Sequence, residues 1–423
     1  MITPDYLNEI MDAIEDKASG LANYLLQSIA KAIITMLKRG EQYFMPSTLS
    51  DLKKLMVKGF SLQEIERILS EVMPGIQADI RNAFLNAAQE ISLQNIEIAR
   101  KIVEFKHLSS VVVPKLEQIG IVREAEQLHL TPTEIRKMEI AYKRTNGTIK
   151  NITKTLAGAS QQAFINTCDE AYMKVQAGVS PQKAIIESIE MMCEKGIQYV
   201  DYQSGRSDRV EVAIARAVRT GVNQANGEIV MERCAETGIG YILTSSHLGA
   251  RVTKVDDYTN HSWWQGRVFS IDWGKLPDYT AEINDDSGRF AWMEAMRAEM
   301  LEKQSKIDRS YPDFVESCGW GNMLGIGGIN CRHSFYPFTP GVNIIPDRPD
   351  EEENEKRFKL DQKQRAMERY IRQTKRLLAG AKGIGDKDLT KQYKQKLENE
   401  MEAYMSFCQQ NGLKPRMSAL RTA

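Results

Sequence analysis

Residues 7–36, LNEIMDAIEDKASGLANYLLQSIAKAIITM, decide the fold of this chain. Their apolar side chains recur at positions 7, 10, 11, 14, 21, 25, 29, 33 and 36, which is the spacing of an amphipathic helix with about 3.6 residues per turn. Gly40 follows as a residue that ends helices. A helix with one long apolar stripe has to bury it against partner surfaces, so the stretch predicts a helical assembly.

More helices are predicted downstream of this stretch. A second helix starts at Ser61, where Glu64 completes a capping box, and we expect Pro74-Gly75 to break it. Similar apolar spacing over residues 76–102 predicts a third helix. Further helix starts are expected at Thr133 and at Ser180-Pro181. Residues 1 to about 235 are therefore predicted to be entirely helical.

The composition changes after residue 205. Residues 206–236 predict a helix whose polar face is rich in Arg, and all five Trp residues lie between Tyr241 and His333. Short β-like runs at 240–244, 267–271 and 333–338 predict strands, and the glycines of 319–328 predict a mobile turn. The prediction is thus a helical arm over 1–205 followed by a small α+β module over 206–345.

Length and composition exclude several classes of protein. The 423 residues suggest about three domains, and the 56 Lys and Arg residues balance 56 Asp and Glu residues, which excludes a globally basic nucleic-acid binder. Six cysteines without a CxxC pair favour a reducing compartment over a disulfide framework. The first residues lack a signal peptide, and the apolar runs are too short to span a bilayer, so no membrane partner is expected.

Residues 346–423 are predicted to form a connector rich in Pro and acidic residues, followed by a basic helical tail. Between Lys356 and Lys396, 14 Lys or Arg residues face four Asp or Glu residues, a local excess of ten positive charges. The pattern fits either a solvated helix face or a surface that neutralises phosphates. The candidate nucleic-acid contacts are Lys356, Arg357, Lys359, Lys363, Arg365, Arg369, Arg372, Lys375 and Arg376.

Four residues of the module are candidate metal ligands. Cys331 and His333 would leave the same face of a strand, and with His247 and His261 they offer the donors that zinc takes. Packed or hydrogen-bonded side chains are the alternative, because zinc ligands usually come in two close pairs. With the Asp256-Asp257 pair, the same residues suit a metal-dependent hydrolase. The usual enzyme motifs for phosphate, dinucleotide, zinc-protease and serine-hydrolase sites are missing.

Three motifs in a fixed order carry a family resemblance. They are HLGAR at 247–251, NHSWWQGRVFS at 260–270 and GINCRHSFYPF at 328–338. The set closely resembles the phage minor capsid protein 2 family, and it is similar to the Mu-type head-morphogenesis proteins, whose ending has a second Cys where this chain has His333. The family-motif residues are Arg216, Arg219, Asn223, Arg251, Trp264, Gly266, Asn330 and Arg332.

The resemblance implies a structural minor capsid protein of a tailed phage rather than an enzyme. It implies a place inside the virion near the portal, after assembly in the host cytoplasm, with a role in head assembly or in contacting packaged DNA. The implied partners are the portal protein, other head proteins and DNA, with a homo-oligomer or few copies bound to a ring. No cofactor is implied, zinc being the exception that the His and Cys residues suggest, and the alternative function is the metal-dependent hydrolase.

Overall fold

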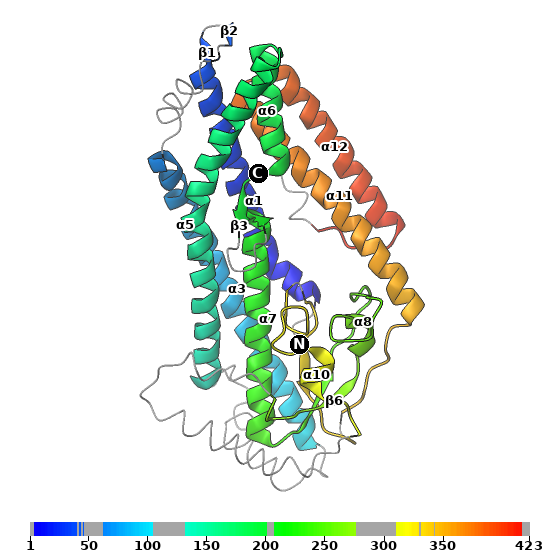
Figure 1. Ribbon diagram of the computed structural model, residues 1–423. Coiled ribbons are helices and arrows are strands. Elements are labelled where there is room, and N and C mark those ends of the chain that lie inside the picture. The colour runs from blue at the N-terminus through cyan, green and yellow to red at the C-terminus, as the bar shows by residue number, and fades with distance from the viewer. Residues whose placement is uncertain are drawn as a thin grey trace. The chain divides into compact units, whose positions relative to one another are not determined.

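The computed structural model describes residues 4–39, 42–43, 45, 62–104, 132–200, 207–275, 310–329, 331–341 and 343–416. These residues are predominantly helical, with a small three-stranded antiparallel sheet and a helical C-terminal region (Figure 1). The predicted fold class is therefore confirmed.

The elements follow one another in this order along the chain. They are α1 (Pro4–Leu37), β1 (Lys38–Arg39), β2 (Gln42–Tyr43), α3 (Leu62–Glu104), α5 (Pro132–Gln176), α6 (Pro181–Lys195), β3 (Gln198–Val200), β4 (Ser207–Arg209), α7 (Val210–Thr237), β5 (Tyr241–Thr244), α8 (His261–Trp264), β6 (Val268–Ser270), α10 (Phe314–Cys318), β7 (Phe335–Pro337), α11 (Glu351–Ile384) and α12 (Lys387–Gln410).

α1 buries the apolar stripe that the sequence predicted. Leu7, Ile14, Leu25 and Ile33 are each at most 1% exposed, whereas Lys31 on the opposite side is exposed. By length and composition the helix is also apolar enough to cross a membrane, with a mean hydropathy of 1.2 over its most apolar window. Because 56% of that window is buried inside the protein, the helix has the burial of a core helix.

Pro74 lies inside α3 and does not end it, so the predicted break is wrong. A proline in a helix interior removes one backbone hydrogen bond and costs about 3 kcal/mol. The apolar stripe continues across it, however, with Ile68, Met73, Ile76 and Ile80 buried. Burying each such side chain stabilises the fold by about 1.5–3 kcal/mol, so the stripe outweighs the proline.

The first 235 residues are also not entirely helical. β1 pairs with β2, and β3 pairs with β4, in two antiparallel two-stranded ladders. These strands are only two or three residues long. Strands of that length are too short to produce the period-two alternation by which a sequence reveals a strand.

The acidic run that was expected in the connector instead begins α11. Asp350 accepts a hydrogen bond from the Glu353 backbone N–H at 3.0 Å, and Glu351, Glu352 and Glu353 form the first helical turn. Carboxylates are favourable there because the N-terminal end of a helix carries partial positive charge. The prolines at 346 and 349 do remain outside the helix.

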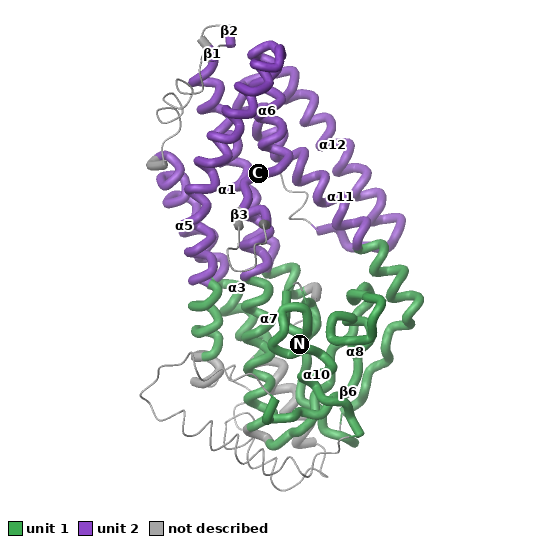
Figure 2. The backbone as a smooth tube through the Cα atoms, in the orientation of Figure 1, with its two compact units in different colours: residues 1–10, 81–145, 218–361 green, residues 11–80, 146–217, 362–423 purple. Residues whose placement is uncertain are grey.

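The chain divides into two compact units (Figure 2). Unit 1 comprises residues 1–10, 81–145 and 218–361, and unit 2 comprises residues 11–80, 146–217 and 362–423. Unit 1 therefore holds the whole three-stranded sheet, and unit 2 holds both short hairpins and α12.

In unit 2, α11 approaches its neighbours at two glycines. A Cβ on Gly383 would overlap the backbone carbonyl oxygen of Gln27 in α1, and a Cβ on Gly380 would meet Sγ of Cys193 in α6. One turn before Gly380, Arg376 is 2% exposed and donates from Nε to the Cys193 carbonyl oxygen at 2.9 Å. The C-terminal part of α11 is thus a core helix of unit 2.

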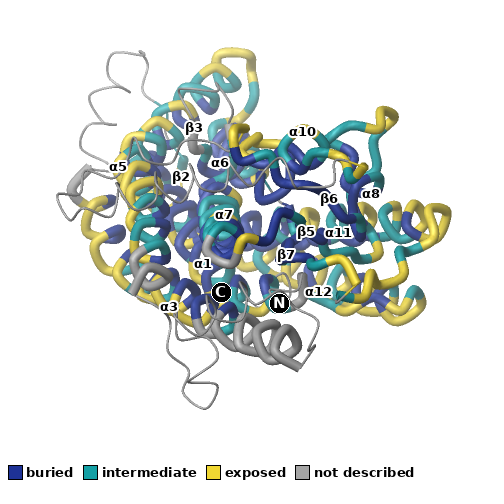
Figure 3. The backbone as a smooth tube through the Cα atoms, turned by 90° about the horizontal axis from the view of Figure 1, so that it is seen from below, coloured by how far each residue is buried: buried dark blue, intermediate teal, exposed yellow. Residues whose placement is uncertain are grey.

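Unit 1 combines helix segments with the sheet. Phe84 of α3 meets Tyr142 of α5 edge to face at 5.9 Å, and Lys137 of α5 pairs with Glu232 of α7 at 3.1 Å. The sheet has the strand order β6-β5-β7, and most of its residues are buried (Figure 3). α7 therefore packs against α5 on one side and against the core of the sheet on another.

Gly383→Ala is predicted to destabilise the protein, because the new methyl group has to displace the α1 backbone at Gln27. We expect a loss of about 1–3 kcal/mol, the usual cost of overpacking a core, in urea or thermal unfolding. Gly158→Ala in α5 is the matched control, since a Cβ there has no described atom within 4 Å. The control should be neutral or stabilising by up to about 1 kcal/mol. Equal stability of the two variants would contradict the close approach of α11 to α1.

Candidate functional site

One face of α7 supports the α+β module. Asn223 donates from Nδ2 to the Cys331 carbonyl oxygen at 2.6 Å and is 4% exposed. One turn later, a Cβ on Gly227 would overlap the Trp320 ring and touch Phe335. Residues four apart lie on one helix face. The same face of α7 therefore donates the Asn223 hydrogen bond and, at Gly227, lets Trp320 approach the helix backbone.

The three predicted β runs are confirmed as β5, β6 and β7. In the centre, Ile242 of β5 lies opposite Phe269 of β6 and Pro337 of β7. One sheet face joins a large core that also contains Trp264, Trp273, Phe314 and Trp320. The other face joins a smaller core of Leu243, Val268 and Phe338. The tryptophans that the structure describes in this core serve packing.

Residues 319–329 form hydrogen-bonded turns, which corrects the predicted mobile turn. The Ile326 N–H donates to the Cys318 carbonyl oxygen at 2.8 Å. Arg251 donates to the carbonyl oxygens of Leu324 and Ile329, each at 3.2 Å. The family-motif residue Arg251 thus fixes this segment beside the His and Cys residues.

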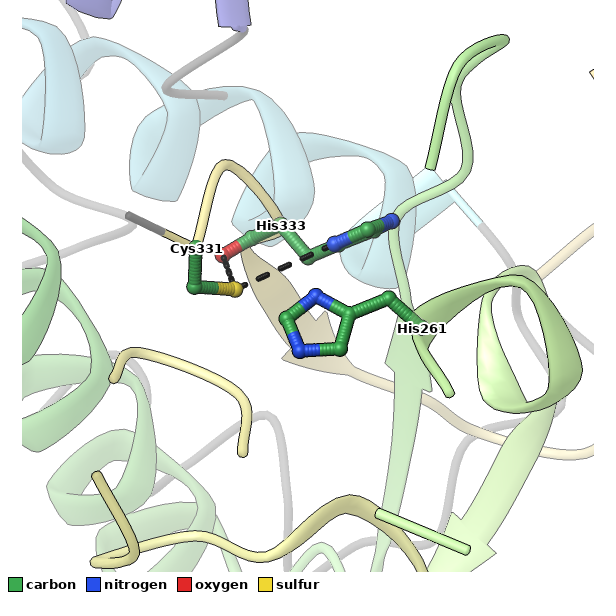
Figure 4. Close-up of side chains that lie close together, drawn as sticks. All are labelled: His261, Cys331 and His333. Carbon is green, nitrogen blue, oxygen red and sulfur yellow. Dashed lines mark hydrogen bonds between the residues drawn. The ribbon is translucent and has the colours of Figure 1, made fainter. Parts of the chain in front are cut away.

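Three of the four predicted metal ligands come together. The ligand atoms of His261, Cys331 and His333 lie within 4.8 Å of one another, and their side chains converge (Figure 4). Each of the three is at most 3% exposed. His247 is not among the three, and its ring stacks on His333 with the ring centroids 4.3 Å apart. These three residues are the His/Cys cluster.

Burial sets the ionisation of the His/Cys cluster. It lowers the pKa of His261 to about 4, and it lowers the pKa of His333 well below the usual value. Burial also raises the pKa of the Cys331 thiol. The metal-free cluster therefore holds two neutral imidazoles and a protonated thiol near pH 7. These are donor types that zinc takes, once the thiol gives up its proton.

The Asp256-Asp257 pair serves its own loop. Asp257 Oδ1 accepts from the Thr259 hydroxyl at 2.6 Å and from the Thr259 N–H at 2.8 Å, and these bonds lower the pKa of the Asp257 carboxyl. Asp256 accepts from the Asn260 side chain at 3.0 Å. Both carboxylates are thus engaged in local hydrogen bonds, and neither belongs to the His/Cys cluster.

Two motif residues are set by backbone and packing. Trp264 is fully buried, and its Nε1 donates to the Tyr258 carbonyl oxygen at 3.1 Å. Gly266 has φ 63°, a conformation that residues with a Cβ rarely adopt. Trp264 ends α8 and Gly266 lies in the turn between α8 and β6, so both residues shape this connection.

The remaining motif residues lie on α7 and near the His/Cys cluster. Arg216 pairs with Asp208 within unit 2. Arg219 and Arg332 are partly buried and have protein partners. Asn330 lies outside the described residues. The described arginines of the motif are thus engaged within the protein.

The family model for phage minor capsid protein 2 matches residues 2–409. The chain belongs to the phage minor capsid protein 2 family. Over 85 residues, or 20% of its length, it is 35% identical to a structural protein of Lactococcus phage LL-H and 34% identical to a structural protein of Lactococcus phage mv4. The match spans 23% of the LL-H protein and 68% of the mv4 protein. No solved structure matches the chain.

Membership confirms the family resemblance that the three motifs carry. It makes this chain a structural component of a phage virion. Neither the family description nor the names of the two relatives refers to hydrolysis, so the hydrolase alternative gains no support.

Two residues that build the candidate site were not identified from the sequence. Asn354 of α11 is fully buried, and its Oδ1 accepts from the N–H groups of Gly249 at 2.9 Å and Ala250 at 3.0 Å. Gln265 is 1% exposed, and its Oε1 lies 3.2 Å from His333 Nε2. Asn354 interrupts an acidic run, which is the one sequence signal for it. Gln265 lies within a quoted motif and has no signal of its own.

The nine predicted nucleic-acid contacts differ in exposure. The exposed ones are Lys356, Lys359, Lys363 and Arg369. The partly buried ones are Arg357, Arg365 and Arg372. The buried ones are Lys375 and Arg376. Arg376 also pairs with Glu211 at 3.5 Å, so neither buried side chain is open to a phosphate in this fold.

Lys375→Met is predicted to stabilise the protein at neutral pH, because it removes an ammonium group that folding buries. Burial lowers the pKa of Lys375 from 10.5 to about 8. Below about pH 8 the lysine is charged in both the folded and unfolded states. The free-energy cost of burying the ammonium group, on the order of 2–3 kcal/mol, is then fully present. Between about pH 8 and 10.5 the unfolded chain binds the extra proton, so the wild type regains stability relative to the variant as pH rises.

Urea unfolding of both proteins across this pH range measures the difference. Lys382→Met is the matched control, since Lys382 is an exposed lysine of the same helix. Its difference from the wild type gives the baseline for removing a lysine from the surface of this helix. A Lys375→Met difference with the same pH dependence as this baseline contradicts the buried ammonium.

Proposed function

We propose that this chain is an internal, low-copy structural component of the phage head, located near the portal, whose α11 and α12 contact packaged DNA. It assembles in the host cytoplasm with the portal and other head proteins, as a homo-oligomer or as few copies on a ring. It works by position, without a membrane partner and without catalysis. Family membership supports the place in the virion, and a row of exposed lysines on α12 supports the DNA contact.

A row of lysines on α12 is the observation that carries the DNA contact. Lys387, Lys391 and Lys394 recur at the i, i+4 and i+7 positions, so they share one helix face, and each is exposed. Within the described part of the chain, none of the three forms an ion pair. The next position on this face, one turn after Lys394, is Glu398.

Two acidic residues of the same region have partners within the protein. Asp386 caps α12 by accepting from the N–H groups of Asp388 and Leu389, both at 3.0 Å. The Glu368 side chain is 4% exposed and pairs with Arg416 at 3.2 Å. Folding thus buries the Glu368 carboxylate, whereas Lys387, Lys391 and Lys394 lie in solvent. Lysines arranged in this way neutralise phosphates without reading base sequence.

The virion location is tested with purified particles of the phage that encodes the chain. We expect quantitative mass spectrometry to find far fewer copies of this chain than of the major capsid protein. A membrane-impermeant, lysine-reactive label should modify the chain after DNA release but not in intact particles. Absence from the particle, capsid-like abundance or labelling in intact particles would each contradict the proposal.

Replacing Lys387, Lys391 and Lys394 together by Gln is predicted to weaken binding of the full chain to duplex DNA. Each lost phosphate contact lowers the slope of log affinity against log salt by roughly 0.9, so the slope should fall by roughly 2 to 3. Fluorescence anisotropy of a labelled duplex at several salt concentrations measures this slope.

The matched control replaces Lys143, Lys150 and Lys154, which are exposed on one face of α5, by Gln. It removes the same charge from another helix and should leave the slope unchanged. Equal losses in the two triple variants, or wild-type protein that fails to bind DNA at low salt, reject the contact through α12.

A further inference from the structure

The His/Cys cluster joins two segments that are distant in the sequence. His261 begins α8, whereas Cys331 and His333 precede β7 (Figure 4). Cys331 Sγ lies 3.8 Å from His333 Nδ1, and Asn223 of α7 donates to the Cys331 carbonyl oxygen. A group bound by the cluster would therefore cross-link α8 and the segment before β7, and Asn223 ties that segment to α7.

The hydrogen bond of His261 fixes which of its ring nitrogens is free. His261 Nε2 lies 2.9 Å from the Leu324 carbonyl oxygen. A carbonyl oxygen only accepts, so Nε2 carries the proton. In the neutral ring, Nδ1 then keeps its lone pair, and Nδ1 is the nitrogen available to a metal.

The same reasoning fixes His333. Its Nε2 lies 3.2 Å from Gln265 Oε1, and that oxygen also accepts from the His247 backbone N–H at 3.0 Å. The backbone N–H can only donate, so it sets the orientation of the Gln265 amide with the oxygen toward His333. His333 Nε2 is therefore the donor, and its Nδ1 lone pair faces Cys331.

We propose that His261 Nδ1, His333 Nδ1 and Cys331 Sγ bind one structural Zn²⁺ ion that holds the α+β module together. One sulfur and two imidazole nitrogens are a donor set that zinc prefers. Zn–S and Zn–N bonds of about 2.3 and 2.0–2.1 Å place tetrahedral donors roughly 3.6 Å apart, close to the Cys331–His333 separation. The thiol proton leaves to solvent as the ion binds.

The surroundings match those of a bound metal. Ligating histidines usually donate their other ring N–H to a carbonyl or amide oxygen, as both do here, to Leu324 and to Gln265. Without a metal, the single thiol proton can satisfy only one of the two Nδ1 lone pairs. Three protein ligands leave the fourth tetrahedral position of the ion to a water molecule. The near-complete burial of the cluster keeps a larger substrate away from that position, so the ion would stabilise the module.

The test measures zinc in the full chain purified without chelators. We expect about one zinc per chain by elemental mass spectrometry, and a fall in melting temperature when a chelator removes it. Cys331→Ser and His261→Gln should lose the ion. Cys234→Ser is the matched control, because Cys234 is fully buried in the same core and lies outside the cluster, and this variant should keep the ion.

Two further measurements keep the test decisive if Cys331→Ser fails to fold. Cobalt substituted into the wild-type chain should show the thiolate-to-metal charge-transfer band and the intense visible bands of a tetrahedral site. Gln265→Leu keeps all three ligands but loses the oxygen that orients His333, so zinc affinity should fall by about 10- to 100-fold.

Less than about one-tenth equivalent of zinc in the wild type, with no uptake from added zinc, overturns the proposal. A cobalt form without the charge-transfer band overturns it as well, since Cys331 is then not a ligand. Zinc retained by folded Cys331→Ser would assign any bound ion to another place in the chain. None of these outcomes depends on where the protein lies in the virion.

Discussion

Gly227 has no side chain, and that absence sets how closely α7 approaches the α+β module. Trp320 and Phe335 rest on the helix at this point, and one turn earlier Asn223 meets the Cys331 carbonyl group. A side chain at position 227 would push Trp320 outward, at a cost of about 1–3 kcal/mol or more, and disturb the contact with Cys331. The position of the His/Cys cluster therefore depends on a helix that contributes none of its three side chains.

Local spacing allowed much of the fold to be predicted. The helices and the runs that became β5, β6 and β7 follow from residues close together in the chain, which is where apolar periodicity acts. Pro74 misled the prediction because the burial of Ile76 and Ile80 beyond it is a tertiary effect that outweighs a local penalty. The exposure of the charged residues could not be predicted from the sequence either. A count of charges is the same whether Arg376 faces solvent or pairs with Glu211.

The candidate site shows the same division. Cys331 and His333 are two residues apart, so their proximity was predictable, whereas His261 reaches them only because α8 packs against the segment that precedes β7. His247 has the same chemistry, but the fold stacks its ring on His333 instead of directing it into the His/Cys cluster. Residue type and order identified the candidates, and the fold selected among them.

Asn354 makes the start of α11 part of the module. Its side chain bonds the backbone of Gly249 and Ala250 and the Ser262 hydroxyl, from the first turn of a helix in which each residue adds a rotation of about 100°. One residue inserted between Glu351 and Asn354 would turn the amide away from all three partners. The same insertion between the exposed Ile344 and Ile345 only lengthens a loop, at little cost in closure entropy. Changes in chain length are therefore tolerated ahead of α11, and the register of its first turn is fixed.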